Sequence, residues 1–153
     1  MTAPQNAPDW LLHDELSPDV DNDPLAPMYE GSARGELVLP FCTSCLLPLD
    51  LEQPVCDGCG SLECVWRVVA PVGTVHSSTV MHRAEPGLVR IDDPYPIIDV
   101  ELASGHRLIM TTLESTQLPL PIDAPVRVAF RNLGKIAVPA AQPTAPAETE
   151  ASS

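Results

Sequence analysis

Positive charge, aromatic side chains and long apolar runs are all scarce in this sequence. Eight Lys and Arg stand against 21 Asp and Glu, and the formal net charge of the 153 residues is −13. A chain with this charge repels nucleic acids and anionic membranes, so we expect neither as a partner. No apolar run approaches the roughly 20 residues that span a bilayer. With two Trp, two Tyr, two Phe and 18 Pro, the chain favours a small, strand-rich fold over long helices.

The sequence also lacks a nucleophile motif and a secretory start. No Ser lies in the G-x-S-x-G motif that exposes a nucleophile on a sharp turn. The first twenty residues contain no Lys or Arg, whereas a secretory signal begins with positive charge. We therefore expect a cytoplasmic protein that carries no catalytic residue of its own.

Both ends of the sequence have compositions that do not form a core. Residues 1–30 contain seven Asp or Glu, five Pro and no Lys or Arg. Mutual repulsion and little apolar surface predict a flexible acidic segment over residues 1–23. Residues 10–12, Trp-Leu-Leu, are the apolar exception, and we expect them to dock onto another surface. Residues 139–153 are a low-complexity Pro/Ala tail, which we predict to be disordered.

The middle of the sequence predicts one short helical segment and then a series of strands. Residues 24–36 suit the helical segment, because Asp23 can cap its N-terminus and Pro24 fits the first helical position. From residue 65 onward, apolar and polar residues alternate between turn signals, as they do in strands. Six strands are expected, at residues 65–72, 74–82, 96–103, 106–113, 125–131 and 133–138.

Two of these strands have a clear period of two, which predicts one buried and one solvated face. The apolar members are expected in the core, and the charged members, Arg131 among them, in solvent. Short, bent strands over about 70 residues close most readily into a barrel, so we expect an OB fold at residues 65–138. The alternating residues are Ile98, Asp99, Val100, Glu101 and Leu102 in the third strand, and Val126, Arg127, Val128, Phe130 and Arg131 in the fifth.

Cys42, Cys45, Cys56 and Cys59 form two CxxC pairs with ten residues between them. Each pair can form a tight knuckle, and two facing knuckles complete a tetrahedral site of four thiolates. Such a closed site leaves no position for water or substrate, so we predict a structural metal ion, with zinc favoured and iron possible. Disulfides or redox pairs are disfavoured, because cytosolic thiols are reduced and neither pair opens a helix after a strand. Cys64 lies outside both pairs, and we expect it to be buried as an apolar residue.

The second predicted strand places two histidines on one face. A period of two aligns His76, Ser78, Val80 and His82. We interpret the histidines as exposed or hydrogen-bonded residues of a barrel wall, because no carboxylate lies at local spacing to orient either ring.

Several pieces of the sequence occur in a specific order, and together they indicate a known family. After the run GELVLPFC at residues 35–42 and the CxxC pairs come Trp66, GTV at 73–75, TVMHRA at 79–84 and PYPIIDVEL at 94–102. Over residues 24–138 the sequence resembles the zinc-ribbon/OB-fold acyl-CoA-associated proteins. The resemblance implies a short N-terminal helical segment, a rubredoxin-like zinc ribbon at 37–64 and an OB barrel at 65–138. The cysteines of the two CxxC pairs match the metal ligands of that family.

The sequence departs from that family at two turns. Leu46 follows the first knuckle, where the family commonly has Gly. Asp123, Ala124 and Pro125 stand where the family has a Gly before its penultimate strand. Neither change removes a metal ligand.

The resemblance also implies a function. Proteins of that family are small partner subunits of thiolase-superfamily enzymes, in thiolysis, condensation or retro-aldol removal of steroid side chains. We therefore expect a non-catalytic zinc-binding accessory subunit that stabilises a thiolase-like aldolase or thiolase, with acyl-CoA at or near the interface. Residues 10–12 and the turn at Tyr29 are expected to order against this partner. Arg83 and Arg90 flank a loop and could bind the phosphates of coenzyme A, since guanidinium pairs with phosphate bidentately.

Two other functions stay open. An OB fold can bind single-stranded nucleic acid, although residues 65–138 have seven basic against seven acidic residues and few aromatics for base stacking. A four-thiolate ribbon that binds iron would be a rubredoxin-like electron carrier.

Overall fold

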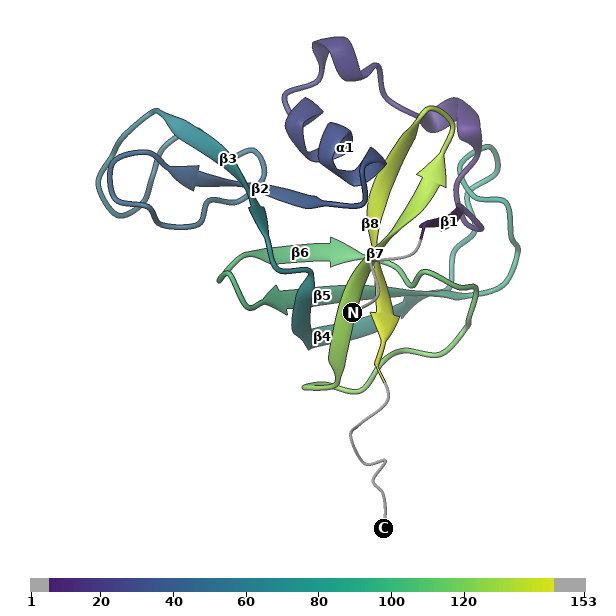
Figure 1. The fold of residues 1–153 in the computed structure, drawn as a ribbon. Helices are drawn as coiled ribbons and strands as arrows, with labels where there is room; N and C mark the ends of the chain where they lie inside the picture. The colour runs from purple at the N-terminus through teal and green to yellow at the C-terminus, as the bar shows by residue number, and fades with distance from the viewer. Residues whose placement is uncertain (1–5, 145–153) are drawn as a thin grey trace.

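A six-stranded sheet that curls into a barrel forms the body of the molecule in the computed structural model, which describes residues 6–144 (Figure 1). Within the sheet the strand order is β1-β7-β4-β5-β6, and β8 pairs with β7. The Leu113 N–H donates to the Ala141 carbonyl at 2.8 Å, and the Ala141 N–H donates to the Thr111 carbonyl at 2.9 Å. These bonds join the chain after β6 to β8 and close the barrel, which confirms the predicted OB fold. The strands are β1 (Asn6–Pro8), β4 (Val72–Met81), β5 (Tyr95–Leu102), β6 (Arg107–Met110), β7 (Pro125–Leu133) and β8 (Ile136–Pro143).

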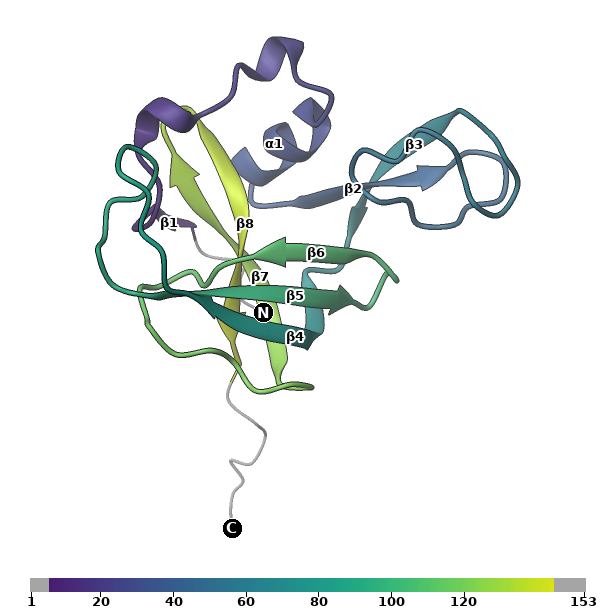
Figure 2. The same cartoon turned by 180° about the vertical axis from the view of Figure 1, so that it is seen from behind.

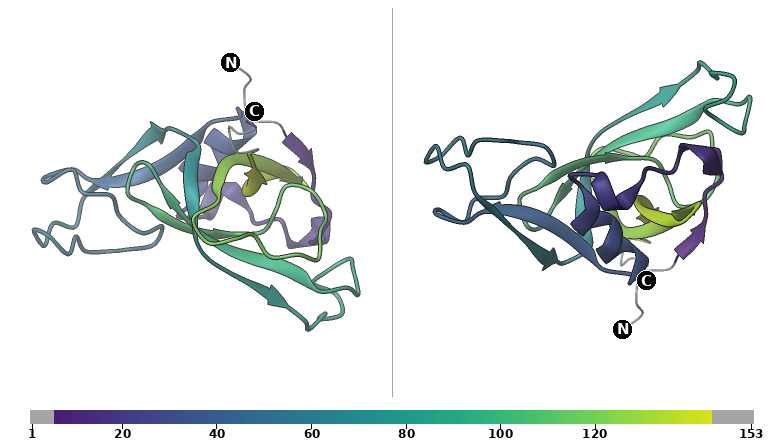
Figure 3. Two further views of the ribbon diagram at one scale, coloured as in Figure 1. Left: turned by 90° about the horizontal axis from the view of Figure 1, so that it is seen from below. Right: turned by 90° about the horizontal axis from the view of Figure 1, so that it is seen from above.

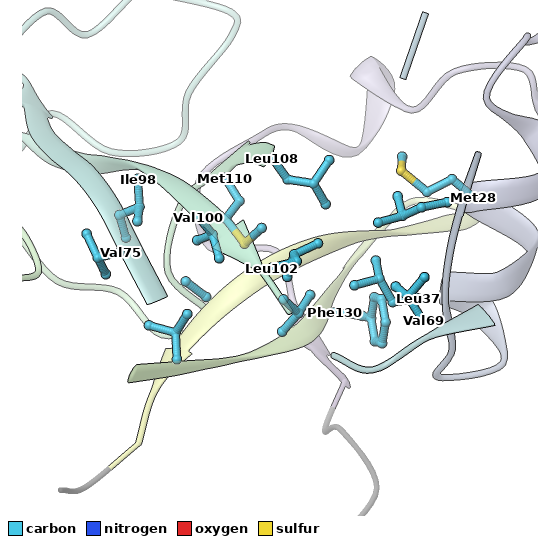
Figure 4. Close-up of a cluster of buried hydrophobic side chains, with 14 of the residues drawn as sticks. Met28, Leu37, Val69, Val75, Ile98, Val100, Leu102, Leu108, Met110 and Phe130 are labelled. Carbon is cyan, nitrogen blue, oxygen red and sulfur yellow. The ribbon is translucent and has the colours of Figure 1, made fainter. Parts of the chain in front are cut away.

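The core fills the inside of this barrel. Ile98, Val100 and Leu102 of β5 are at most 3% exposed, and the apolar members of β7 are buried opposite them, as the period of two predicts. Figure 4 shows Val100 and Leu102 of β5 in the same buried cluster as Phe130 of β7. Each such side chain contributes roughly 1.5–3 kcal/mol when it is fully removed from water. Burial of the apolar face that this alternation creates therefore favours closure of the sheet into a barrel.

A two-stranded ribbon projects from the barrel (Figure 3). Its strands are β2 (Leu37–Cys42) and β3 (Cys64–Val69), which pair antiparallel from Cys42 opposite Cys64 to Leu37 opposite Val69. The prediction of a barrel strand at 65–72 is wrong, because residues up to 69 pair with the ribbon strand. Pro71 lies between β3 and β4, and its missing N–H ends the ladder there.

The ribbon and the barrel share one core. Leu37, Leu39 and Val69, at the base of the ribbon, pack in the same buried cluster as Phe130 and the other barrel residues. Residues 64 and 65 therefore do not separate two independent hydrophobic cores.

Helix α1 (Ala26–Ala33) lies between the ribbon and the β7–β8 hairpin (Figures 1 and 2). It begins later than expected, because Leu25 and not Asp23 precedes its first turn. The Asp23 Oδ1 atom instead accepts the N–H of Leu25 at 2.8 Å. A Cβ on Gly31 would lie 2.4 Å from Val38 Cγ2, so glycine is needed where the helix approaches β2. No helix within residues 6–144 is long and apolar enough to cross a membrane.

The acidic N-terminal residues that the structure describes pack along the barrel. β1 pairs parallel with β7, and the chain continues through two short 3₁₀ turns, η1 (Asp14–Leu16) and η2 (Val20–Asn22). Trp10 Nε1–H donates to the Thr112 carbonyl at 2.9 Å, and Leu11 is 6% exposed. Residues 10–12 thus dock onto the chain's own barrel, whereas the sequence predicts that they order against a partner. Residues 1–5 lie outside the described part of the chain.

Arg131 is one of the residues that hold this segment against the barrel. Its Nη1 atom lies 3.0 and 2.9 Å from the two carboxylate oxygens of Asp9, and both side chains are buried. The sequence-based placement of Arg131 in solvent is therefore wrong. Its partner is 122 positions away in the chain, so the alternation within β7 could not reveal the pair.

The C-terminal strand is longer than expected. β8 extends through Pro143, whereas the Pro/Ala composition predicts disorder from residue 139. Ala140 and Ala141 are fully buried, and both pair with β7. Small side chains allow this close packing, so the low complexity of the segment does not prevent strand formation. Residues 145–153 lie outside the described part of the chain.

Candidate metal centre

The four cysteines of the CxxC pairs meet at the outer end of the ribbon. Their sulfur atoms all lie within 4.8 Å of one another. The Sγ atoms of Cys42 and Cys59 are 3.5 Å apart, and those of Cys45 and Cys56 are 3.4 Å apart. A tetrahedral zinc ion with Zn–S bonds of about 2.3 Å needs sulfur atoms about 3.8 Å apart. The donor set and its spacing therefore fit a four-thiolate metal ion.

The two knuckles have the same backbone hydrogen bonds. In the first, the Cys42 N–H donates to the Leu47 carbonyl and the Cys42 carbonyl accepts the Leu46 N–H, both at 2.9 Å. In the second, Cys56 makes the equivalent bonds with Ser61 at 3.0 Å and Gly60 at 2.9 Å. Leu46 has φ 65° and Gly60 has φ 77°, so these two residues occupy equivalent left-handed positions.

The backbone of the first knuckle favours a thiolate. The N–H of Cys45, and to a lesser extent that of Ser44, lower the pKa of the Cys42 thiol to about 6. Backbone N–H groups also act to lower the pKa of Cys45 and of Cys59, but neighbouring thiols and burial outweigh them and raise both values. Metal ions bind the thiolate and not the thiol, so this environment prepares Cys42 as a ligand. Four sulfur donors select zinc or iron over calcium or magnesium, which prefer oxygen.

The end of the ribbon has little apolar packing of its own. Its buried cluster consists of Cys42, Leu49 and Cys56. A cluster this small cannot fix a long turn, and a bound metal supplies folding energy in such modules. A tetrahedral ion held by four thiolates has no position for a substrate, so the arrangement suits a structural role.

Cys64 does not join this cluster. It lies at the start of β3 and is exposed, so the expectation of a buried apolar residue is wrong. The outer end of a two-stranded ribbon has too few neighbouring elements to cover the side chain.

The two histidines expected on one face of this strand do not form a regular polar face, and His82 lies just beyond the end of β4. The pairing register between β4 and β5 shifts between Val75 and Ser77, so the alternation that aligned His76 with His82 is interrupted. His76 is exposed, and its Nδ1 atom lies 3.7 Å from Glu101 Oε1 on the neighbouring strand. A carboxylate does therefore approach one ring, across the sheet and not along the strand.

The two arginines proposed for coenzyme A differ in their surroundings. Arg83 Nη2 lies 2.9 Å from Glu85 Oε1, and the Arg83 side chain is 80% exposed. Arg90 donates from Nε to the Leu12 carbonyl at 2.7 Å and from Nη2 to Asp14 at 3.0 Å. Arg90 thus holds the N-terminal segment against the barrel. Contact of either residue with coenzyme A stays a prediction.

His106 is an important residue that the sequence analysis missed. Its Nε2 atom lies 2.8 Å from the Pro40 carbonyl of β2, and its Nδ1 atom lies 2.7 Å from Ser104 Oγ. A carbonyl only accepts, so Nε2 donates, and in the neutral ring Nδ1 accepts the Ser104 hydroxyl. The ring meets Phe41 edge-on at 4.9 Å between centroids. His106 therefore joins the turn before β6 to the ribbon.

Comparisons with known proteins agree with this architecture. Residues 66–131 match the family of ChsH2 C-terminal OB-fold domains. A probable enoyl-CoA hydratase alpha subunit of Thermomonospora curvata is 28% identical over 123 residues, which are 78% of this chain and 37% of that relative. The chain thus spans well under half of the curated relative. A solved structure described as an Ltp2-ChsH2(DUF35) aldolase has a TM-score of 0.68 and 26% identity, over 83% of this chain and 98% of that one.

The fold, the cysteine cluster and these matches lead to the same family. The order of ribbon and barrel is the one that the resemblance implies, and the matched domain begins within β3 and ends in β7. The resemblance found in the sequence is confirmed: residues 66–131 form a ChsH2-type OB-fold domain, and the ribbon and barrel together are similar to those of the zinc-ribbon/OB-fold acyl-CoA-associated proteins.

Proposed function

We propose that this chain is a non-catalytic accessory subunit that binds and stabilises a thiolase-like acyl-CoA enzyme. The observation that carries the proposal is the structural match to the Ltp2-ChsH2(DUF35) aldolase, which extends over 98% of the matched chain. The partner is a thiolase-superfamily aldolase or thiolase, and degradation of a steroid side chain is one setting. The acyl-CoA substrate lies at or near the interface.

Zinc is the metal that we assign to the ribbon. Cys42, Cys45, Cys56 and Cys59 would hold it, and its role is to fix the two knuckles relative to each other. The convergence of four thiols on one point supports this scaffold role. A reducing cytoplasmic setting would keep these thiols available.

Reconstitution with the partner tests the proposal. The chain is co-expressed with candidate thiolase-superfamily proteins, and the acyl-CoA cleavage activity of the purified material is measured. We expect the two proteins to elute together and the partner to gain solubility or activity. Elution of this chain as a monomer, with no gain in the partner, would contradict the proposal.

Arg83 offers the cleaner test of coenzyme A contact. We propose that it meets a phosphate group, and its protein partner Glu85 is an exposed neighbour in the same loop. Arg83→Ala should raise the apparent KM of the complex for acyl-CoA and leave assembly unchanged. Arg90→Ala is the less specific variant, since Arg90 also holds the N-terminal segment. An unchanged KM in both variants would show that neither arginine contacts coenzyme A.

Iron in place of zinc would favour the electron-carrier function. Four thiolates accept either metal, and a ferric four-thiolate site absorbs visible light whereas a zinc site is colourless. Elemental analysis of protein grown without added metal, together with its visible spectrum, distinguishes the two. We expect zinc and no visible absorbance.

A further inference from the structure

Leu46 occupies a backbone position that favours glycine. It has φ 65°, and the equivalent residue of the second knuckle is a glycine, Gly60, at φ 77°. The left-handed region is costly for a residue with a Cβ atom, and Asn and Asp tolerate it better than Leu. The second non-glycine residue at positive φ within residues 6–144 is Asp123, which belongs to that tolerant class.

Burial of the leucine side chain within this chain does little to offset the cost of its backbone conformation. Leu46 is 58% exposed, so most of its apolar surface faces water. A residue that is unfavourable for its backbone and also exposes apolar surface has two costs in the isolated chain. Strain of this kind persists where it serves a functional contact.

Other apolar side chains are exposed around the same two knuckles. We call Leu46, Leu47, Val55 and Leu62 the ribbon-tip patch, and their exposed fractions are 58%, 46%, 43% and 76%. Leu47 lies over the second knuckle, since a Cβ on Gly58 would be 2.5 Å from Leu47 Cδ1. Because the ribbon projects from the barrel, its tip is accessible to another molecule (Figures 1 and 3).

The charge of the ribbon tip restricts what can cover the patch. Residues 43–63 contain four acids, Asp50, Glu52, Asp57 and Glu63, and no Lys, Arg or His. All four acids are exposed. A second copy of this chain would bring like charges together, whereas a surface with basic residues around an apolar recess would be complementary.

We propose that the ribbon-tip patch is the surface through which this chain docks onto its catalytic partner, in an apolar recess bordered by Lys and Arg. The inference rests on the proposed function, because that function requires a catalytic partner. The new claim is which surface of this chain binds it. Leu46 and Leu62 are its central anchors, because they are the two most exposed members of the patch. The acids at its edge orient the encounter and make association depend on salt.

Leu46→Asn and Leu62→Ser remove the anchors without disturbing the knuckles. Asn tolerates the left-handed backbone, so the Leu46→Asn chain should bind as much metal as the wild type and melt at the same or a higher temperature. Affinity for the thiolase-superfamily protein that co-purifies with the wild-type chain, measured by calorimetry, should fall about tenfold or more in the double variant. Raised salt should slow association with the wild type.

Leu118→Ser is the matched control, because Leu118 is 71% exposed in the loop between β6 and β7, where its neighbours, such as Thr112 and Gln142, belong to the barrel. It should bind the partner as the wild type does. If the wild type forms the complex and the Leu46→Asn, Leu62→Ser variant binds equally well, the docking surface is wrong and the proposed function stands. Equal weakening by Leu118→Ser would also overturn the proposed docking surface. If the wild type forms no complex, both proposals fail.

A second copy of this chain is the other molecule that could cover the ribbon-tip patch. Analytical ultracentrifugation of the wild-type chain alone should show a monomer over the concentrations used for binding. A dimer that the Leu46→Asn, Leu62→Ser variant abolishes would overturn the proposal in favour of a second copy of this chain.

Discussion

At the scale of single residues, His106 links the ribbon to the barrel while remaining neutral. Its ring is buried, donates to the Pro40 carbonyl and accepts from Ser104. Burial lowers the pKa of His106 below its usual 6.5, although the Pro40 hydrogen bond opposes the shift. A proton on Nδ1 would also displace the Ser104 hydroxyl hydrogen from that bond.

This environment predicts a stability that depends on pH. The unfolded chain titrates His106 at about 6.5 and the folded chain at a lower value, so the unfolded state binds more protons below pH 6.5. The contribution of the neutral ring is therefore complete above that pH and is lost as the pH falls toward the folded pKa. Urea unfolding of the wild type and His106→Gln across this range measures the difference. Equal pH slopes in the two proteins would contradict the assignment.

The Asp9–Arg131 pair is a second residue-scale feature. Asp9 Oδ1 also accepts the N–H groups of Leu11 and Leu12, at 2.7 and 2.9 Å, so the carboxylate organises the chain after β1. Asp9→Asn would leave the buried guanidinium uncompensated, at a cost of about 3–5 kcal/mol in the free energy of unfolding. In a double-mutant cycle with Arg131→Met, the double variant should be less destabilised than the sum of the single ones. Additive losses would show that the pair is not coupled.

At the scale of elements, we expect the ribbon to depend on a bound metal and the barrel on its apolar core. The knuckles enclose a small apolar cluster, whereas β4, β5 and β7 bury a continuous apolar face. The two regions should therefore differ in what unfolds them.

The Cys45→Ser variant tests whether the ribbon and the barrel depend differently on the metal. We expect the variant to lose bound metal and amide protection over residues 43–63, since a sulfur ligand is gone and little packing replaces it. The barrel strands should keep their protection, because their apolar faces do not depend on the knuckles. Hydrogen exchange followed by mass spectrometry measures both.

Cys64→Ser is the control for this prediction, since Cys64 lies outside the group of four thiols. It should retain its metal and its pattern of exchange. Full protection of the ribbon in metal-free Cys45→Ser protein would contradict the account.

Element patterns also explain what could be predicted from the sequence. The period of two at Ile98, Val100 and Leu102 and the CxxC spacing are local signals, and both correspond to observed structure. The base of the ribbon was misassigned, because residues 65–69 have the same alternation whether they pair with β2 or with the barrel. Asp9–Arg131 and His106–Pro40 join residues 122 and 66 positions apart, and no local pattern records such contacts.

At the scale of the whole molecule, one core unites a barrel, a short helix and the base of a projecting ribbon. The formal net charge of −13 is spread over a surface from which the acid-only ribbon tip extends. The ribbon projects from the barrel and carries the four-cysteine site at its outer end, an arrangement that suits the proposed docking onto a larger protein. The strained, exposed Leu46 at the end of the ribbon is consistent with that use.

Native mass spectrometry of the co-expressed proteins tests the central claim most directly, because a single spectrum reports both bound metal and partner. The account predicts a hetero-oligomer of this chain and its thiolase-superfamily partner, with one zinc ion for each copy of this chain. A folded chain that carries no metal and appears free of the partner would contradict it.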